Sequence, residues 1–185
     1  VIESNHKGVK SAILFHRQLA NNLSGAIANR SSFDAPDFSE EQAFEEIRHT
    51  KSKMPYVSFT IYRAMIYYFN GQIEELFSML KIITETQHEC YIYFFYYIYL
   101  TVETITLINY PEKAKSYKFH HRKIIKNNYK TFKELSERCP ENFLNNFLLI
   151  QAEIAKTKGK TAQAARLYEQ AIQSASENGF NNMAG

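Results

Sequence analysis

Apolar residues recur every three or four positions along most of the chain, which is the spacing of helices with one buried face. The pattern predicts about eight helices, with residues 24–38 as the longest loop because that stretch shows no period. The predicted helices cover residues 5–23, 39–49, 55–69, 72–86, 88–109, 111–138, 140–158 and 161–178.

Residues typical of helix ends support these boundaries. Ser39 and Gln42 have the spacing of a capping box, in which the Ser39 hydroxyl accepts from the Gln42 amide and the Gln42 side chain reaches back. Proline is tolerated in the first turn of a helix and glycine stops a helix, so further ends are expected at Pro111, Pro140, Gly159 and Gly179.

Residues 139–179 form the clearest predicted hairpin. In tetratricopeptide (TPR) repeats, small side chains let two antiparallel helices approach, and one aromatic residue fills the remaining hole. Here the small residues are Ala152, Ala164 and Ala171, the turn carries Gly159, and Tyr168 is the large residue.

A second hairpin of the same register is centred on Asn70-Gly71. Its residues lie 88 positions before their counterparts, so that Ala64, Tyr67, Gly71, Leu76, Leu80 and Ile83 precede Ala152, Ala155, Gly159, Ala164, Tyr168 and Ala171. Because this displacement is not a multiple of the ~34-residue TPR period, we expect the region between the hairpins to be irregular.

The predicted fold class is therefore all-α, with TPR-like antiparallel helical hairpins stacked in a right-handed superhelix. We expect residues 1–185 to form a single helical-repeat segment, with N-terminal helices and a loop over residues 1–51, irregular repeats over 53–137 and the best TPR-like hairpin over 140–179. The chain opens without methionine or a secretory leader, which indicates a piece of a longer protein.

Composition restricts the class of protein further. Hydrophobic residues make up 45% of the chain, enough for a continuous core, and 6 glycines and 4 prolines are too few for an all-β protein. Cys90 and Cys139 form no CxxC pair, which favours a reducing cytoplasm over a secreted disulfide scaffold. The uncharged run from Tyr91 to Val102 is shorter than the ~20 residues of a membrane span, so we expect a buried helix and no membrane partner.

The last third of the chain resembles the helical region of very large bacterial signalling proteins. The resemblance rests on Cys139–Leu144, Gln151–Ala155, Leu167–Ile172 and Glu177–Phe180, and continues more loosely upstream at Phe38–Glu41, Tyr67–Gly71 and Glu89–Phe94. In that family a serine/threonine-kinase-like domain, an AAA-type ATPase, this helical stretch, a GAF sensor and a histidine kinase share one polypeptide. The resemblance implies a cytoplasmic, non-catalytic segment of a signal-transduction kinase.

No motif within the chain predicts catalysis, a cofactor or a metal. Gly71 and Gly159 are isolated turn glycines, so there is no phosphate-binding loop. The segment around His16 lacks the aspartate of a kinase catalytic loop, and His88 has no second histidine four positions on. His120 and His121 point about 100° apart on a helix and cannot both face one ion.

A row of cations on the predicted helix 111–138 is the strongest residue-based indication of function. The row would run ~27 Å along one side of that helix, opposite Tyr117, His121, Ile124, Asn128 and Leu135. It is either a solvated outer face, a docking surface for an acidic domain, or a nucleic-acid site, the last being disfavoured because no exposed aromatic residues alternate with the cations. This candidate interaction ridge consists of Lys115, Lys118, Arg122, Lys126, Lys130 and Lys133.

Three functions remain open at this stage. The favoured one is a non-catalytic segment that couples neighbouring domains of one polypeptide or binds a protein partner; the others are an independent peptide-binding TPR module that uses a basic helix face, and an enzyme fragment. Open ends of a helical stack also commonly self-associate. The apolar residues expected at the two ends are Ile13, Phe15 and Leu19, and Leu167, Ala171, Ile172, Phe180 and Met183.

Overall fold

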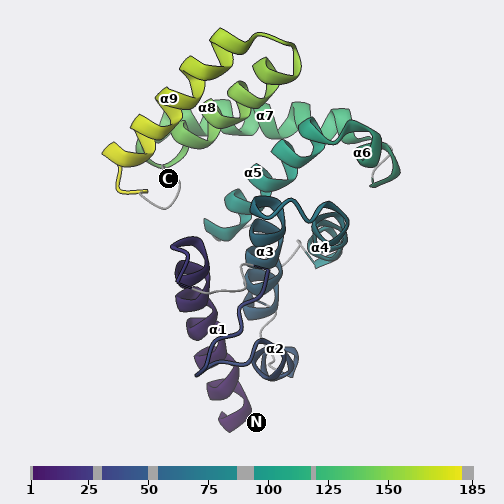
Figure 1. The fold of residues 1–185 in the computed structure, drawn as a ribbon, viewed down its shortest axis with the longest axis vertical. Helices are drawn as coiled ribbons and strands as arrows, with labels where there is room; N and C mark the ends of the chain where they lie inside the picture. The colour runs from purple at the N-terminus through teal and green to yellow at the C-terminus, as the bar shows by residue number, and fades with distance from the viewer. Residues whose placement is uncertain (1, 27–30, 50–53, 87–93, 118–119, 181–185) are drawn as a thin grey trace. The chain divides into compact units, whose positions relative to one another are not determined.

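The computed structural model describes residues 2–26, 31–49, 54–86, 94–117 and 120–180, and this part of the chain is helical (Figure 1). Within it, the only strand-like pairing is an isolated bridge between Ala35 and Phe38. The expected all-α class is therefore confirmed. The helices are α1 (Ile2–Leu23), α2 (Glu40–Arg48), α3 (Met54–Phe69), α4 (Ile73–Thr86), α5 (Phe94–Asn109), α6 (Pro111–Tyr117), α7 (His121–Arg138), α8 (Pro140–Thr157) and α9 (Thr161–Glu177).

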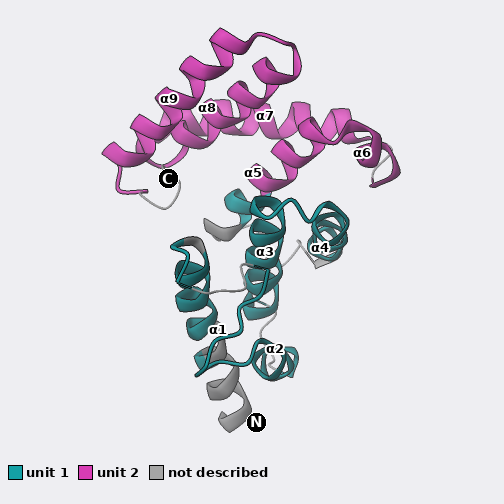
Figure 2. Ribbon diagram, in the orientation of Figure 1, with its two compact units in different colours: residues 1–99 teal, residues 100–185 magenta. Residues whose placement is uncertain are grey.

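The chain divides into two compact units, residues 1–99 and residues 100–185, with the boundary inside α5 (Figure 2). Unit 1 contains α1 to α4, in which α3 packs against α1, α2 and α4. Unit 2 contains the second half of α5 and α6 to α9, in which α8 packs against α7 and α9.

Glycine ends both predicted hairpin helices in the same way. Gly71 and Gly159 have φ of 69° and 71°, a left-handed conformation that costs little only for a residue without Cβ. The next amide then bonds back over five residues, from Gln72 N to the Tyr67 carbonyl at 2.9 Å and from Lys160 N to the Ala155 carbonyl at 3.0 Å. Ala26 N after Gly25 and Phe180 N after Gly179 bond in the same way, so the pattern is common to the helices that end at these glycines.

Ser39 caps α2 as predicted, since its hydroxyl accepts from Gln42 N at 3.3 Å. The preceding loop does more than connect two helices. Phe33 and Phe38 are buried in it, and their rings lie 5.4 and 5.1 Å from that of Phe15 on α1. The loop therefore supplies part of the unit 1 core, which its lack of hydrophobic period did not indicate.

The same aromatic cluster corrects one expectation about open ends. Phe15 is only 1% exposed, because Phe59 of α3 also contacts it with ring centroids 4.6 Å apart. Phe15 is therefore a core residue with partners inside unit 1. Ile13 is 64% exposed and Leu19 is half-buried.

In unit 2, the residues of α5 from Leu100 to Leu107 are all buried, including four polar ones. Three of these, Thr101, Glu103 and Thr104, accept hydrogen bonds from neighbouring helices. Thr101 accepts from Asn146 of α8, and Thr104 accepts from Asn128 of α7, each at 2.9 Å. Polar side chains thus fix the register of α5 against α7 and α8.

The single helix expected over residues 111–138 is wrong, because α6 ends at Tyr117 and α7 begins at His121. Both helices reach the buried carboxylate of Glu103, through the Tyr117 hydroxyl at 3.3 Å and the Asn128 amide at 3.4 Å. Eleven residues of continuous helix would separate these two side chains by ~16 Å along the axis, too far to share one carboxylate. The buried side chain of Glu103, which is hydrogen-bonded to both α6 and α7, therefore favours two helices over one.

The α8–α9 hairpin has small residues at its crossing. Ala152, Ala164 and Ala171 are 0%, 4% and 8% exposed, which allows the two backbones to approach. The half-buried Tyr168 donates its hydroxyl to Glu153 of α8 at 2.8 Å.

The buried position of Ala164 leads to a stability prediction. Ala164→Leu inserts three carbon atoms into the packed α8–α9 crossing and should lower the free energy of unfolding by about 1–3 kcal/mol. Ala165 is the adjacent, exposed residue, so Ala165→Leu should change stability by less than about 0.5 kcal/mol. Urea unfolding followed by circular dichroism measures both variants, and equal stabilities would contradict the packing described.

Candidate functional site

The exposed cations of α7 form the basic surface of unit 2. Arg122, Lys123 and Lys126 are exposed and make no ion pair with any described residue. Farther along α7, Lys130 lies 3.6 Å from Glu134 and Lys133 lies 3.9 Å from Glu137. Of the four α7 cations that make no ion pair with a described residue, three therefore lie in the first two turns, and Arg138 lies in the last turn.

The remaining members of the candidate interaction ridge are placed differently. Lys115 belongs to α6 and is paired with Glu112 at 2.7 Å, and Lys118 lies outside the described residues. Hydrogen bonding to Lys115 is also the main cause of the lowered pKa of Glu112. The break after Tyr117 separates Lys115 from the cations of α7, so the ridge does not lie on one helix.

The opposite face of α7 holds these cations in an outward orientation. Its buried residues are His121, Asn128, Phe132 and Ser136, spaced so that they share one side of the helix. Asn128 is fixed further by its bonds to Thr104 and Glu103. We define the α7 basic face as Arg122, Lys123 and Lys126. Because rotation of α7 would bury these cations and expose its buried side, this face is a fixed surface.

His120 and His121 do not form a metal pair. His120 is exposed, whereas His121 is buried with its Nδ1 atom lacking a hydrogen-bond partner. Among the described residues, no group of three or more His, Cys, Asp and Glu side chains has a geometry that could hold a metal ion.

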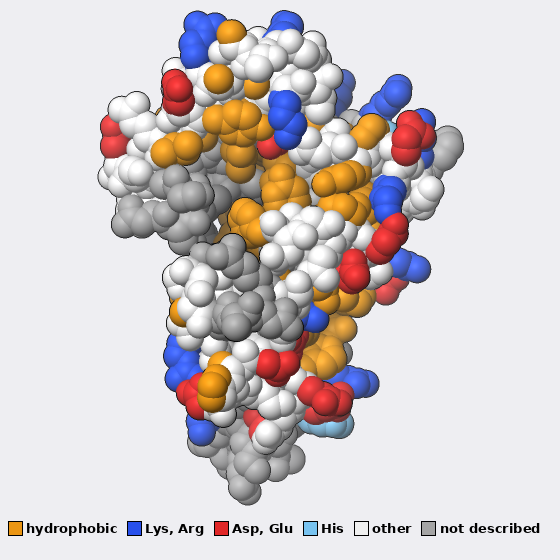
Figure 3. Space-filling model, viewed as in Figure 1, with side chains coloured by type: hydrophobic (Ala, Val, Ile, Leu, Met, Phe, Trp, Pro, Cys, Tyr) orange, Lys and Arg blue, Asp and Glu red, His pale blue; other side chains and the backbone are white. Residues whose placement is uncertain are grey.

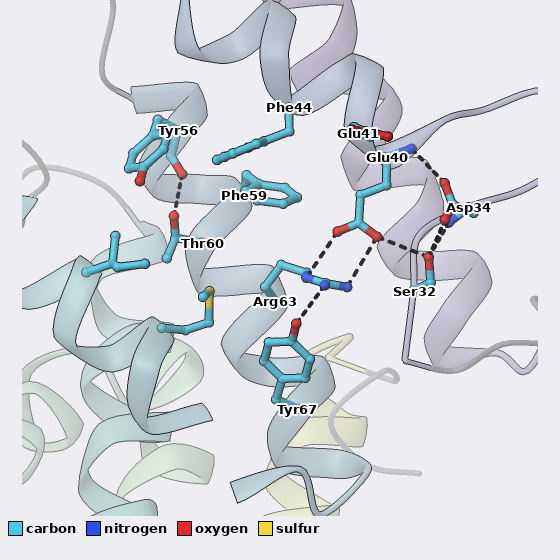
Figure 4. Close-up of a pocket in the computed structure, with 12 residues that line it drawn as sticks. Ser32, Asp34, Glu40, Glu41, Phe44, Tyr56, Phe59, Thr60, Arg63 and Tyr67 are labelled. Carbon is cyan, nitrogen blue, oxygen red and sulfur yellow. Dashed lines mark hydrogen bonds and ion pairs between the residues drawn. The ribbon is translucent and has the colours of Figure 1, made fainter. Parts of the chain in front are cut away.

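Unit 1 contains a pocket of about 440 Å³ that sequence reasoning missed (Figure 4). It lies over α3, between residues of α2 and α4 and the loop that precedes α2. One part of its lining is apolar, from Phe44, Tyr56, Phe59, Met79 and Ile82, and the rest is polar, from Ser32, Asp34, Glu40, Glu41, Thr60, Arg63 and Tyr67.

Arg63 and Glu40 form the central ion pair of this pocket. Arg63 Nε lies 3.0 Å from Glu40 Oε1, and the two side chains are only 18% and 13% exposed. The guanidinium also donates to the Glu40 Oε2 atom, to the Ser31 carbonyl at 2.9 Å and to the Tyr67 hydroxyl at 2.6 Å. Arg63 is the single charged residue of α3, and this isolation in an apolar helix is the sequence signal that could have identified it.

Glu40 and Asp34 connect the loop to the same network. Glu40 Oε2 accepts from the Ser32 hydroxyl and from Phe33 N, while Asp34 Oδ1 accepts from Glu40 N at 2.8 Å. The hydrogen bond from the Glu40 amide, with that from Ser32, lowers the pKa of Asp34, so its contribution to stability is present at neutral pH and is lost as the pH falls through the lowered pKa. Burial raises the pKa of Tyr67.

These contacts define what the network can do. The donors of Arg63 hold the loop, α2 and α3 together. The pocket thus places an apolar area beside charges that the network holds in position.

Comparison of the chain with protein-family models, with curated proteins and with solved structures gives no match. In the described part of the chain, the helices are all too short or too polar to cross a membrane. Cys139 is a free thiol beside Glu141 and Asn142, and Cys90 lies outside the described residues.

The Arg63–Glu40 pair leads to a second prediction. Glu40→Gln removes the charge that compensates a mostly buried guanidinium and should lower the free energy of unfolding by about 1.5–3 kcal/mol. Glu41→Gln is the matched control, because Glu41 is exposed and adjacent; it should change stability by less than about 0.5 kcal/mol. Thermal and urea unfolding compare the two, and a Glu40→Gln protein as stable as wild type would show that the network contributes little.

Proposed function

We propose that this chain is a non-catalytic helical-repeat segment of a bacterial signal-transduction kinase or ATPase, and that it couples neighbouring domains or binds a protein partner. In this proposal the two hairpins are TPR-like units of a right-handed superhelix. The constant 88-residue displacement between corresponding positions of the two hairpins supports the repeat relationship. Residues 139–180 resemble the helical region of such signalling proteins. This resemblance supports the proposed type of parent protein and its cytoplasmic location.

The observation that carries the proposal is the α7 basic face. Unit 2 has 13 Lys and Arg against 8 Asp and Glu. Two of those acids, Glu103 and Glu153, are buried, and three more pair with lysines of α6 and α7. An acidic surface of a sister domain or of a partner protein would complement the unpaired cations and speed association.

Nucleic acid is a weaker candidate for the same face. Binding of single strands uses exposed aromatic rings between the cations, on which bases stack. Of the described aromatic residues, only Phe69 is exposed, and it lies on α3 in unit 1. Tyr129 of α7 is half-buried against Phe147 and accepts a hydrogen bond from Gln151. A protein partner therefore fits the surface better than a nucleic acid.

Lysine acetylation footprinting tests the proposal. The purified chain and the native protein in a gentle extract of its own cells are treated with the same reagent, and each lysine is read by mass spectrometry. Lys123 and Lys126 should react several-fold less in the native assembly, because an acidic surface covers them. Lys158 and Lys160, exposed at the α8–α9 turn, are the internal controls and should react equally in both samples.

Two results would contradict the proposal. Equal reactivity of Lys123 and Lys126 in both samples would mean that nothing covers the α7 basic face. Protection that disappears after nuclease treatment of the extract would assign the face to nucleic acid.

A further inference from the structure

One side of the unit 1 pocket is formed by apolar residues of α4. Leu76, Leu80 and Ile83 are the buried residues of α4. Met79 and Ile82 lie three residues apart on a different side of the helix, are half-buried, and line the pocket. An α4 that packed on one side only would have polar residues at these two positions.

Aromatic residues of α2 and α3 extend this apolar surface. Phe44 and Tyr56 are half-buried pocket residues with ring centroids 5.7 Å apart. In the space-filling view, hydrophobic side chains reach the surface between the positions of α2 and α4 (Figure 3). The result is a groove with α3 as its floor, which we call the α2–α4 groove.

Acids outnumber cations among the residues that line the α2–α4 groove. Its lining contains three acids, Asp34, Glu40 and Glu41, and one cation, Arg63, whose charge is compensated by Glu40. Glu41 and Asp34 are exposed. Figure 3 shows acidic side chains on both sides of the apolar area. A ligand of this groove is therefore expected to combine apolar groups with positive charge.

We propose that the α2–α4 groove binds an amphipathic helix of a partner protein that carries an apolar stripe flanked by lysine or arginine. Helices pack by placing the ridges of one into the grooves of another, and helix-in-groove recognition uses apolar anchors at positions i, i+3 or i+4, and i+7. An extended peptide would lack a strand edge to pair with, since the groove walls are helices whose backbone bonds are internal.

This site goes beyond the docking of an acidic partner on α7. It belongs to the other unit, has the opposite charge and is mainly apolar, so either site can exist without the other. A small polar anion is disfavoured as the occupant, because Arg63 already donates to Glu40, Ser31 and Tyr67.

The test uses two synthetic helical peptides of about 15 residues and the full chain. Both peptides carry leucine anchors at the same positions; one has lysine on both flanks and the other has glutamate there. Titration calorimetry at about 0.05 M and about 0.15 M salt should show binding of the lysine peptide that weakens with salt, and at least about tenfold weaker binding of the glutamate peptide. Equal affinities of the two peptides, or no binding of the lysine peptide, would overturn the proposal.

Variants locate the binding on the protein. Met79→Lys and Glu41→Lys should each weaken binding of the lysine peptide by about tenfold or more, through loss of an apolar contact and through charge repulsion. Ile172→Lys and Glu169→Lys are the matched controls, because both residues are exposed on α9 in unit 2; they should leave the affinity unchanged.

Two further measurements separate a loss of binding from a loss of folding and from binding at the other site. Circular dichroism checks that each variant is folded, and the exposed Glu41→Lys change decides the outcome if Met79→Lys does not fold. Lys126→Glu should leave peptide affinity unchanged, which separates this site from the α7 basic face. Unchanged affinity in folded Glu41→Lys protein, or a loss in Lys126→Glu alone, would contradict the proposed groove.

Discussion

The buried carboxylate of Glu153 joins three helices of unit 2. Only 5% of this residue is exposed, and its oxygens accept from Asn109 of α5 at 2.8 Å, Lys156 of α8 at 2.7 Å and Tyr168 of α9 at 2.8 Å. A buried charge is very costly unless such donors surround it, so any arrangement that separates α5, α8 and α9 leaves the carboxylate unsatisfied. Glu103 acts similarly where α5 meets α6 and α7. The way in which the helices of unit 2 pack together therefore depends on the side chains of Glu153 and Glu103.

The structural role of the buried polar groups limits where a partner can bind. The polar atoms of the buried acids and of Arg63 are engaged in holding helices together, so the surfaces left for a partner are exterior ones. The surfaces proposed for partners are the α7 basic face in unit 2 and the α2–α4 groove in unit 1. In the proposed function, opposite charge on the two surfaces would let one chain select two kinds of partner.

Local sequence signals predicted most helix ends and both hairpins. Contacts between residues far apart in the chain could not be predicted from the sequence. Pro111, Pro140 and the glycines act on their own neighbouring residues, and the helices begin or end beside them as expected. The break between α6 and α7 depends on Glu103, which lies on another helix and cannot be inferred from the period of residues 111–138.

The candidate sites show the same division. Exposure of Arg122, Lys126, Lys130 and Lys133 follows from helical spacing alone. The Arg63 network could not be predicted, because its partners Ser31 and Glu40 lie 32 and 23 residues away in the chain. Likewise, Phe33 and Phe38 belong to an aperiodic loop, and their burial is explained by tertiary contacts with Phe15 of α1 and, for Phe33, with Phe59 of α3.

The central claim is that the buried charges of this protein are structural, and the stability of Glu153→Gln protein tests it most directly. The substitution keeps the shape of the side chain and removes the charge that three donors surround. If Glu153 joins the helices as described, the free energy of unfolding should fall by about 1.5–3 kcal/mol. Residues kept for chemistry or binding commonly cost stability, so a variant as stable as wild type, or more stable, would contradict the account and mark Glu153 as a functional group.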